Sequence, residues 1–347
     1  MSFQRALVVI MRHHGDVLLA TPVFRALKRH MSGIEVDALI YSYAGDLLET
    51  CEHIDQIHSV DRQWKNSGVK RLLSEERALL KQLRAREYDL LVVLTDQWRS
   101  IFLSKVLQPR ESVALSFAKR QRAFWKKSFT RNYPSIEHRY MVDLHLDALR
   151  CLGLPIDAED EVVALRVSDA AIEVMNERLA HLDLSDNPYV LVHPTSRGMH
   201  KSWDPGAYAE VIDSLQAGGK QVVISAAPDE HEMAFVRSVL DQCRSAPVDF
   251  GGQLSLMQLA ALIQKAERLL CVDSVPMHMA AALGTPLLAL FGPTDEQQWG
   301  PVGERIEIMA SKRPCRPCLK QGCGGSGRSQ CMSDLSAERV QQQLLKL

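Results

Sequence analysis

Residues 269–294, LLCVDSVPMHMAAALGTPLLALFGPT, predict two buried strands joined by a turn and a short helix. The apolar runs Leu269–Val272 and Pro286–Phe291 are typical of strands covered on both faces. Pro276 suits the first turn of a helix, where the backbone N–H has no partner, and Ser274 before it is a natural N-cap. This stretch therefore predicts a strand–helix–strand unit of a parallel sheet.

The start of this helix predicts a site for an anion. The unpaired amides of a first turn and the positive end of the helix dipole favour a phosphate group. Asp273 and His278 flank the spot and are placed to touch a phosphorylated ligand. A purely structural alternative stays open, in which Asp273 only caps the helix and His278 only packs.

The overall composition is that of a globular protein with two domains. The chain has 347 residues, 46% of them hydrophobic and 24% charged, and the net charge of −1 excludes a generally basic nucleic-acid binder. The apolar runs fall short of the roughly 18 residues that span a bilayer, and Ala6–Met11 is too short for a signal peptide. We therefore expect a cytoplasmic protein whose cysteines are reduced.

Strands and helices alternate twice along the chain, which predicts an α/β fold. Expected strands are Ala6–Ile10, Val36–Ile40 and Tyr88–Leu94, then Tyr189–His193, Gln221–Ser225, Leu269–Val272 and Pro286–Phe291; expected helices include 17–30, 74–86, 139–152 and 256–263. Apolar strands between helices indicate two doubly wound, Rossmann-like domains, which we place at residues 1–165 and 166–347. Such domains bind ligands at the carboxyl ends of their strands, and we expect them to face each other across a cleft.

Asp16 is the candidate general base of the first domain. It follows the first strand within His13-His14-Gly15-Asp16, on the turn at the carboxyl end of that strand. A carboxylate there could take a proton from a bound hydroxyl group. The alternative is a helix N-cap, since aspartate after glycine is a common capping pattern.

The second domain offers two polar loops at equivalent positions. Thr195, Ser196 and Lys201 follow the strand ending at His193 and suit contacts with an oxyanion or a phosphate, unless the loop is merely exposed. Trp203 is expected to hold this loop in place. Asp229 follows the next strand and could accept hydrogen bonds from ribose hydroxyls or simply cap a helix.

Two further segments carry chemistry of their own. Residues 119–131 contain six basic and no acidic residues, interleaved with Phe124, Trp125 and Phe129, which predicts contact with an anionic acceptor or membrane surface, or else a solvated loop. The basic residues singled out for this contact are Lys119, Arg120, Arg122, Lys126 and Lys127. Four cysteines, Cys315, Cys318, Cys323 and Cys331, could hold zinc, although their spacing is irregular for a zinc ribbon and a metal-free loop is the alternative.

Missing motifs narrow the field of enzymes. The chain has no Gly-x-x-x-x-Gly-Lys-Ser/Thr loop, no Gly-x-Gly-x-x-Gly after its first strand and no Gly-x-Ser-x-Gly elbow. These absences argue against a P-loop ATPase or kinase, a nicotinamide dehydrogenase and an α/β-hydrolase.

Taken together, the motifs resemble the ADP-heptose:lipopolysaccharide heptosyltransferases, an inverting glycosyltransferase family. The matching pieces are Gly15–Leu19 with Thr21-Pro22, His193-Pro194-Thr195 through Lys201-x-Trp203, Asp273-Ser274-x-Pro276-Met277-His278 through Pro286, and Leu290–Thr294. The opening Met11–Leu19 is most similar to the type that adds the third, branching heptose of the inner core. One departure is Val275, where the family usually has glycine.

The resemblance implies a GT-B architecture, with the acceptor on the N-terminal domain and the nucleotide sugar on the C-terminal one. It assigns the catalytic base to Asp16 and contact with the donor phosphates to Lys201, and it places Asp273 near the heptose hydroxyls. Residues expected to bind substrate are Gly15, Thr195, Ser196, Asp229, Asp273, Ser274, Val275, Pro276, Met277 and His278.

The expected activity is transfer of a heptose from ADP-heptose to lipopolysaccharide inner core at the cytoplasmic face of the inner membrane. Lys201 and the helix start near Ser274 would stabilise the departing diphosphate, so we expect no metal or cofactor to be required. Two alternatives stay open at this point: a nucleotide-sugar epimerase of GT-B type and a non-enzymatic sugar-nucleotide-binding protein.

Overall fold

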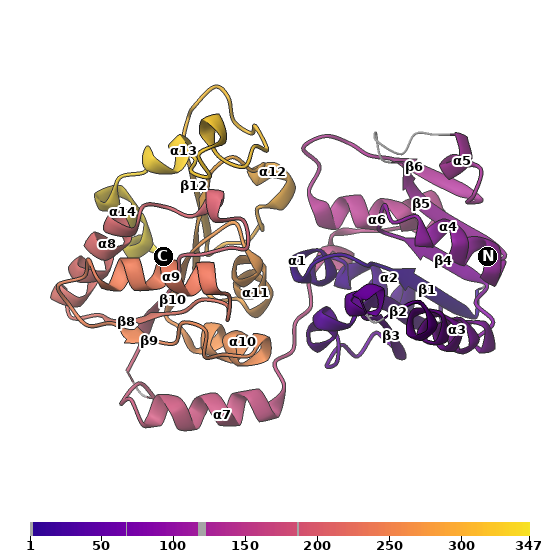
Figure 1. The fold of residues 1–347 in the computed structure, drawn as a ribbon, viewed down its shortest axis with the longest axis horizontal. Helices are drawn as coiled ribbons and strands as arrows, with labels where there is room; N and C mark the ends of the chain where they lie inside the picture. The colour runs from indigo at the N-terminus through magenta and orange to yellow at the C-terminus, as the bar shows by residue number, and fades with distance from the viewer. Residues whose placement is uncertain (1–2, 67, 117–122, 186) are drawn as a thin grey trace. The chain divides into compact units, whose positions relative to one another are not determined.

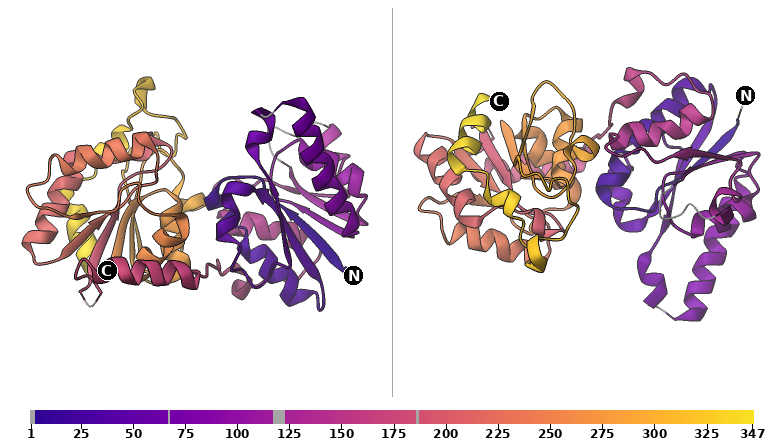
Figure 2. Two further views of the ribbon diagram at one scale, coloured as in Figure 1. Left: turned by 60° about the horizontal axis from the view of Figure 1, so that its bottom comes forward. Right: turned by 90° about the horizontal axis from the view of Figure 1, so that it is seen from above.

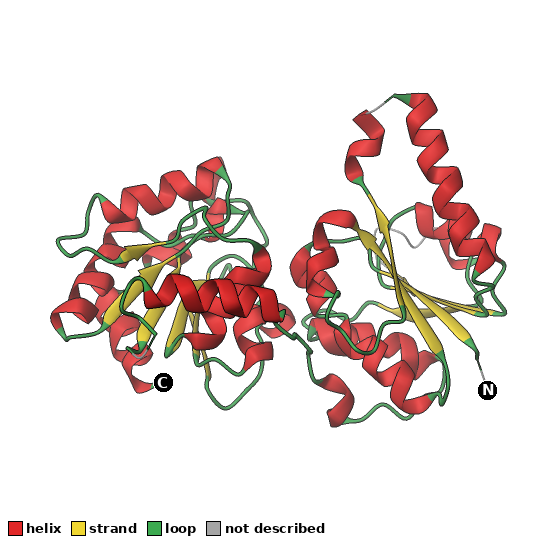
Figure 3. Ribbon diagram, turned by 90° about the horizontal axis from the view of Figure 1, so that it is seen from below, coloured by secondary structure: helices red, strands yellow, loops and turns green. Residues whose placement is uncertain are grey.

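The chain folds into two compact units, Met1–Leu165 and Arg166–Leu347. The computed structural model describes residues 3–66, 68–116, 123–185 and 187–347. Each unit contains a six-stranded sheet whose strands are all parallel, flanked by helices (Figures 1 and 3). The predicted doubly wound α/β fold is confirmed.

The sheet of the first unit has the strand order β3-β2-β1-β4-β5-β6. Its strands are β1 (Arg5–Val9), β2 (Glu35–Tyr41), β3 (Gln56–Val60), β4 (Leu90–Val93), β5 (Glu111–Ser116) and β6 (Arg131–Pro134). The central strands β1 and β4 are apolar on both faces, which is what a sheet covered by helices on each side requires. The switch in direction beside β1 is where such sheets bind ligands.

The helices of this unit lie in two layers. They are α1 (His14–Leu18), α2 (Thr21–His30), α3 (Val69–Ala85), α4 (Arg99–Leu107), α5 (Ala123–Lys126) and α6 (Met141–Cys151), with shorter 3-10 turns at Ser42–Leu47, Arg62–Asn66 and Ala158–Glu161. Side chains of α3 and α4 share one core cluster with β1, β2 and β4, whereas α2 packs against α6. The two layers leave the carboxyl ends of the strands to the loops.

The single helix predicted over residues 17–30 is wrong. The structure has two helices, α1 and α2, because the chain breaks at Leu19 and Ala20. The hydroxyl of Thr21 donates to the carbonyl of Leu18 over 2.8 Å, and Pro22 occupies the first turn of α2. Proline lacks the N–H that would continue the first helix, so a new helix begins there.

The second unit repeats the same topology, with the order β12-β11-β10-β7-β8-β9. Its strands are β7 (Tyr189–His193), β8 (Gln221–Ile224), β9 (Val248–Asp249), β10 (Arg268–Val272), β11 (Leu287–Phe291) and β12 (Ile306–Ala310). The strands of each unit form a twisted sheet flanked by helices (Figure 2). Strands β7, β10 and β11 are almost entirely buried, as their sequences predict.

Helices again cover both faces of this second sheet. They are α7 (Asp169–Ala180), α8 (Pro205–Ala217), α9 (Glu230–Leu240), α10 (Leu256–Lys265), α11 (Val275–Leu283), α12 (Glu296–Trp299), α13 (Gln330–Ser333) and α14 (Ala337–Lys346), with 3-10 turns at Met199–Lys201 and Cys323–Gly325. Helices α8, α9 and α14 share one core cluster with the strands, while α10 packs against α7 and α11. The last helix thus belongs to the core of this unit.

Trp203 anchors the loop that follows β7. Its side chain is 2% exposed, and its indole N–H donates to the carbonyl of Leu335 over 3.1 Å. The ring also contacts Tyr208 of α8 edge-on, with 5.0 Å between ring centroids. The expectation that Trp203 fixes this loop is confirmed.

In the part of the chain that the structure describes, no helix is both long enough and apolar enough to cross a bilayer.

Candidate active site

Asp16 lies at the carboxyl edge of the first sheet, in the first turn of α1. Asp16 is only 8% exposed, and its Oδ1 accepts a hydrogen bond from Nε of Arg12 over 2.6 Å. The N-cap of α1 is His13, so the alternative role of Asp16 as an N-cap is wrong. Gly15 lies beside it in α1, and its carbonyl accepts from the amide of Leu19 over 2.9 Å. The structure thus presents Asp16 as a nearly buried carboxylate held by a guanidinium group.

Arg12 links Asp16 to the neighbouring strand ends. Its Nη1 lies 3.8 Å from Oδ1 of Asp96, which follows β4. The hydroxyl of Tyr43, after β2, donates to the carbonyl of Arg12 over 3.1 Å and lies 3.1 Å from Nδ1 of His13. Side chains after β1, β2 and β4 therefore converge on one edge, as parallel strands require. Sequence reasoning missed Arg12, Asp96 and Tyr43.

A buried histidine lies behind this edge. His145 of α6 is 3% exposed, and its Nδ1 lies 3.2 Å from the carbonyl of Leu19. Burial lowers the pKa of His145 to about 4, against smaller opposing effects of the Leu19 carbonyl and the Asp16 carboxylate. The imidazole is therefore neutral at physiological pH and packs as an uncharged support behind α1.

Lys201 and Asp273 meet at the carboxyl edge of the second sheet. Nζ of Lys201 lies 2.9 Å from Oδ2 of Asp273 and 3.2 Å from its backbone carbonyl. Their side chains are 24% and 7% exposed, so the pair is shielded but reachable from solvent. Lys201 ends the turn after β7, and Asp273 follows β10, the adjacent strand. The structure joins two motifs that the sequence keeps 72 residues apart.

The helix start predicted around Pro276 is present, but its cap differs from the prediction. Ser274 is the N-cap residue of α11, yet its hydroxyl donates to the carbonyl of Val272 over 3.1 Å and makes no capping bond. Val275 is the first helical residue, and the side chains of Met277 and His278 are buried. The hydroxyl of Ser274 therefore leaves the amide of Val275 to another acceptor, as an anion site needs, whereas the amide of Met277 donates to the Ser274 carbonyl and Pro276 has no N–H.

Thr195 forms a second buried polar pair, in the loop after β7 that also carries Lys201. Its hydroxyl donates to Oε2 of Glu232 over 2.6 Å, and both residues are less than a tenth exposed. Ser196 donates to the carbonyl of Gly198 over 3.1 Å, which tightens the same loop. Glu232 was not predicted; its only signal is its position in the first turn of the helix after β8.

His193 ends β7 and lies under the same loop. Its Nδ1 is 3.0 Å from the hydroxyl of Ser225, the residue that follows β8. Burial lowers the pKa of His193 to about 4, so the ring is neutral at physiological pH.

Asp229 acts as the N-cap of α9. Its Oδ1 accepts from the backbone amides of His231 and Glu232 over 3.0 and 3.2 Å. The capping role considered for Asp229 is confirmed. A contact with ribose stays a prediction, and it would involve the second carboxylate oxygen, Oδ2.

The basic segment is only partly described. Lys119, Arg120 and Arg122 lie outside the described residues, whereas Lys126 and Lys127 are exposed at the end of α5. Two of the three aromatic side chains predicted to make contact are instead part of the core, since Trp125 is 0% and Phe129 6% exposed. The prediction is wrong for Trp125 and Phe129, because both side chains belong to the hydrophobic core cluster of the first unit.

Comparison with known proteins fixes the family. Residues 76–326 match the sequence profile of glycosyltransferase family 9 (heptosyltransferase). Lipopolysaccharide heptosyltransferase 3 of Escherichia coli is 35% identical over 292 residues, which are 84% of each chain. The chain belongs to glycosyltransferase family 9. It is therefore an enzyme that transfers a glycosyl group, and the motifs above are those of a heptosyltransferase.

Solved structures of this family share the fold. A family 9 glycosyltransferase of Veillonella parvula superposes with a TM-score of 0.84 at 20% identity, over 100% of this chain and 98% of that one. The ADP-heptose lipopolysaccharide heptosyltransferase II of E. coli gives 0.78 at 20% identity, over 99% and 98%. The two six-stranded sheets are therefore the GT-B fold of family 9.

The four cysteines predicted as possible zinc ligands lie in the described part of this glycosyltransferase. No three histidine, cysteine, aspartate or glutamate side chains lie close enough there to hold an ion. Cys315 is exposed, Cys318 and Cys323 are half-buried, and Cys331 is buried on α13, and all are free thiols. The zinc alternative at these four residues stays a prediction.

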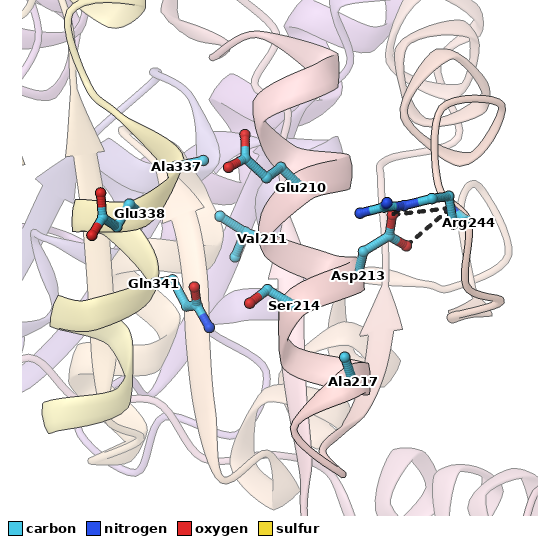
Figure 4. Close-up of a pocket in the computed structure, with 9 residues that line it drawn as sticks. All are labelled: Glu210, Val211, Asp213, Ser214, Ala217, Arg244, Ala337, Glu338 and Gln341. Atoms are coloured by element: carbon cyan, nitrogen blue, oxygen red, sulfur yellow. Dashed lines mark hydrogen bonds and ion pairs between the residues drawn. The ribbon is translucent and has the colours of Figure 1, made fainter.

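A groove between α8 and α14 is separate from the candidate site. It is lined by Glu210, Val211, Asp213, Ser214, Ala217, Arg244, Ala337, Glu338 and Gln341, none of which is a predicted site residue (Figure 4). Asp213 already accepts from Arg244 and Ser245, which lowers its pKa to about 2 against the effect of burial. Its carboxylate therefore stabilises the loop at Arg244 and Ser245 in this family 9 enzyme.

Proposed function

We propose that the enzyme transfers a heptose from ADP-heptose to a heptose of the lipopolysaccharide inner core. The observation that carries this proposal is the 35% identity, over 84% of each chain, to a relative named lipopolysaccharide heptosyltransferase 3. In this proposal the first unit binds the saccharide acceptor and the second unit binds the nucleotide sugar. The two carboxyl edges described above supply the residues for each task.

Asp16 acts as the general base. Arg12 occupies Oδ1 of its carboxylate, which leaves Oδ2 to accept the proton of the acceptor hydroxyl. As that proton leaves, the hydroxyl oxygen bonds to the anomeric carbon and the bond from this carbon to the diphosphate oxygen breaks, with inversion. Arg12 is a positioning residue here, because it holds the carboxylate in one orientation and touches no reacting atom.

Lys201 stabilises the leaving diphosphate. Its ammonium group carries three N–H donors, so it can keep Asp273 and still bind a phosphate oxygen. Negative charge grows on the diphosphate in the oxocarbenium-like transition state, and a fixed ammonium group at that point lowers its energy. The first turn of α11 adds the amide of Val275 and the positive end of a helix dipole. Asp273 remains free on Oδ1 for a hydroxyl of the heptose.

We place this reaction at the cytoplasmic face of the inner membrane, where the enzyme would bind as a peripheral protein. A lipid-linked saccharide acceptor stays in the plane of the bilayer, so a soluble donor must be brought to it. Transfer to such an acceptor therefore favours an enzyme with its own affinity for a membrane surface.

The decisive experiment incubates the enzyme with ADP-heptose and a core acceptor that lacks the branching heptose. Mass spectrometry is expected to show the acceptor gaining one heptose and an equivalent amount of ADP appearing. An isomerised nucleotide sugar without transfer would instead identify an epimerase. Donor binding by calorimetry without any turnover would identify a non-enzymatic binding protein.

A further inference from the structure

Three large aromatic side chains are exposed together on the first unit. Trp98, just before α4, is 42% exposed, Phe102 on α4 is 48% and Phe124 on α5 is 53% exposed. Trp98 and Phe124 lie 6.3 Å apart between ring centroids. Phe102 follows Trp98 by one helical turn, so both lie on one side of α4. We call Trp98, Phe102 and Phe124 the aromatic face.

Lysines border the aromatic face. Nζ of Lys105 lies 4.7 Å from the centroid of the Phe124 ring, and Lys126 and Lys127 follow on and after α5. All three lysines are exposed, and none of them forms an ion pair with another residue that the structure describes. The positive charge beside the exposed rings is therefore not neutralised by the described part of the protein.

A buried ring holds the aromatic face in shape. Trp125 is fully buried, its indole N–H donates to the carbonyl of Leu115 over 3.1 Å, and it packs edge-on against Trp98 with 6.2 Å between centroids. Phe129 packs against Trp125 as well, with 5.1 Å between the ring centroids. The exposed rings thus pack against the core of the unit. This packing holds them in fixed positions, as a binding surface requires. Grouped exposed aromatics of this kind mark interaction sites.

The aromatic face begins beside the carboxylate site. Trp98 follows Asp96 by two residues, and Asp96 lies 3.8 Å from the guanidinium group that holds Asp16. If a lipid surface binds here, the hydroxyl groups of the saccharides anchored in it come near the proposed base. This position matters because the proposed acceptor is a saccharide linked to a lipid.

We infer that the aromatic face and its three lysines dock the enzyme on an anionic phospholipid surface. Aromatic rings favour the boundary between head groups and acyl chains, and lysines are attracted to anionic head groups. The combination of unpaired cations with exposed rings favours this partner over a second copy of the chain, whose matching face would carry the same charge. The inference rests on the proposed function, because it places the membrane beside the acceptor site.

Flotation with two kinds of vesicle tests the inference. The enzyme is expected to bind vesicles of phosphatidylethanolamine and phosphatidylglycerol, and to bind phosphatidylcholine vesicles more weakly. Replacing Lys105, Lys126 and Lys127 with glutamine should weaken the first interaction about fivefold per lysine and remove its salt dependence. The triple variant Trp98→Ala, Phe102→Ala, Phe124→Ala should lose binding to both vesicles. Equal binding by this variant and the unchanged enzyme would overturn the inference.

The matched control removes exposed apolar side chains from the other unit. Val302 and Leu319 are 86% and 65% exposed, and their replacement with alanine should leave vesicle binding unchanged. Thermal unfolding establishes that each variant is folded, and light scattering measures its molar mass. If the unchanged enzyme is a dimer and the aromatic variant is a monomer, the aromatic face binds a second copy of the chain, and the membrane assignment is overturned.

Activity separates this inference from the proposed function. With a delipidated, water-soluble core acceptor, the aromatic variant should transfer heptose as fast as the unchanged enzyme, and with acceptor embedded in vesicles it should be slower. Equal losses on both acceptors would overturn the docking role. If the unchanged enzyme binds vesicles but transfers no heptose to either acceptor, the proposed function fails while the docking surface stands.

Discussion

The ammonium group of Lys201 lies 2.9 Å from the carboxylate of Asp273, across two neighbouring strands of the second sheet. This ion pair fixes the lysine at the carboxyl edge, beside the start of α11. A cation that the protein itself holds in place needs little reorganisation when the leaving group develops charge.

Replacing Lys201 with methionine should therefore lower kcat of heptose transfer by about 10²- to 10³-fold, the range seen when one charge-stabilising donor is removed. Lys220→Met is a matched control, because Lys220 also forms an ion pair, 3.0 Å from Glu267, but precedes β8 at the opposite edge of the sheet. Steady-state transfer assays measure both variants. Similar losses in the two would mean that the effect is structural.

Asp16→Asn should abolish measurable transfer, because an amide cannot take the acceptor proton. Binding of ADP-heptose, measured by calorimetry, should be unchanged. Arg12→Ala should lower kcat by a smaller factor, since the carboxylate remains but is no longer oriented. Added guanidinium should partly restore the Arg12→Ala rate and should not rescue Asp16→Asn.

Arg5→Ala is the control for this pair of variants. Arg5 forms an ion pair with Glu35 at the amino end of the same strand, β1, with 3.1 Å between Nε and Oε2. Its loss should leave kcat unaffected. The positioning role of Arg12 is refuted if guanidinium restores nothing, or if Arg5→Ala is equally impaired.

Chelation of divalent metals should leave the rate of transfer unchanged. Lys201 and the first turn of α11 already supply the positive charge that a metal ion would bring to the diphosphate. Initial rates with and without EDTA measure this. A loss of activity that magnesium restores would show that the protein's own charges do not suffice.

The protein should lose stability as the pH falls from about 6.5 towards 4. Burial lowers the folded-state pKa of His145 and of His193 to about 4, so the unfolded chain takes up protons first as the pH drops. Each histidine should cost about 2 kcal/mol between pH 7 and pH 5, at 1.36 kcal/mol for each unit below its unfolded value. Asp37 and Asp213, with pKa values of about 2, act only below this window.

Urea unfolding at pH 7 and pH 5 checks this pH dependence. His145→Gln should reduce the dependence of the free energy of unfolding on pH, whereas His181→Gln, at an exposed position after α7, should not. An unchanged slope in His145→Gln would contradict the assignment to buried neutral histidine.

The strands β1, β2, β4, β7, β8, β10 and β11 were predictable because buried parallel strands have a strong local pattern, whereas β3, β5, β6, β9 and β12 were not predicted. Tyr189–His193 forms β7 with the predicted bounds, since its five residues are all buried. The interruption at Leu19 was not predictable from apolar spacing, because it depends on Thr21 bonding back to Leu18. Periodicity alone continues through such a break.

The site was predictable residue by residue but not as contacts. Lys201 and Asp273 each stood out in a motif, yet their pairing depends on the order of β7 and β10 in the sheet. Arg12 gave no signal, because its role comes from a turn that folds it back on Asp16. Trp125 was misplaced because its basic neighbours suggested solvent, whereas its indole bonds inward to Leu115.

The indole of Trp203, two residues after Lys201, donates a hydrogen bond to the backbone of Leu335, which lies two residues before the final helix. The carboxyl-terminal helix thus takes part in placing the lysine, although it contributes no side chain to the reaction. Deleting this helix should therefore both loosen the loop that carries Lys201 and remove Val340 and Leu344 from the core that packs on the sheet.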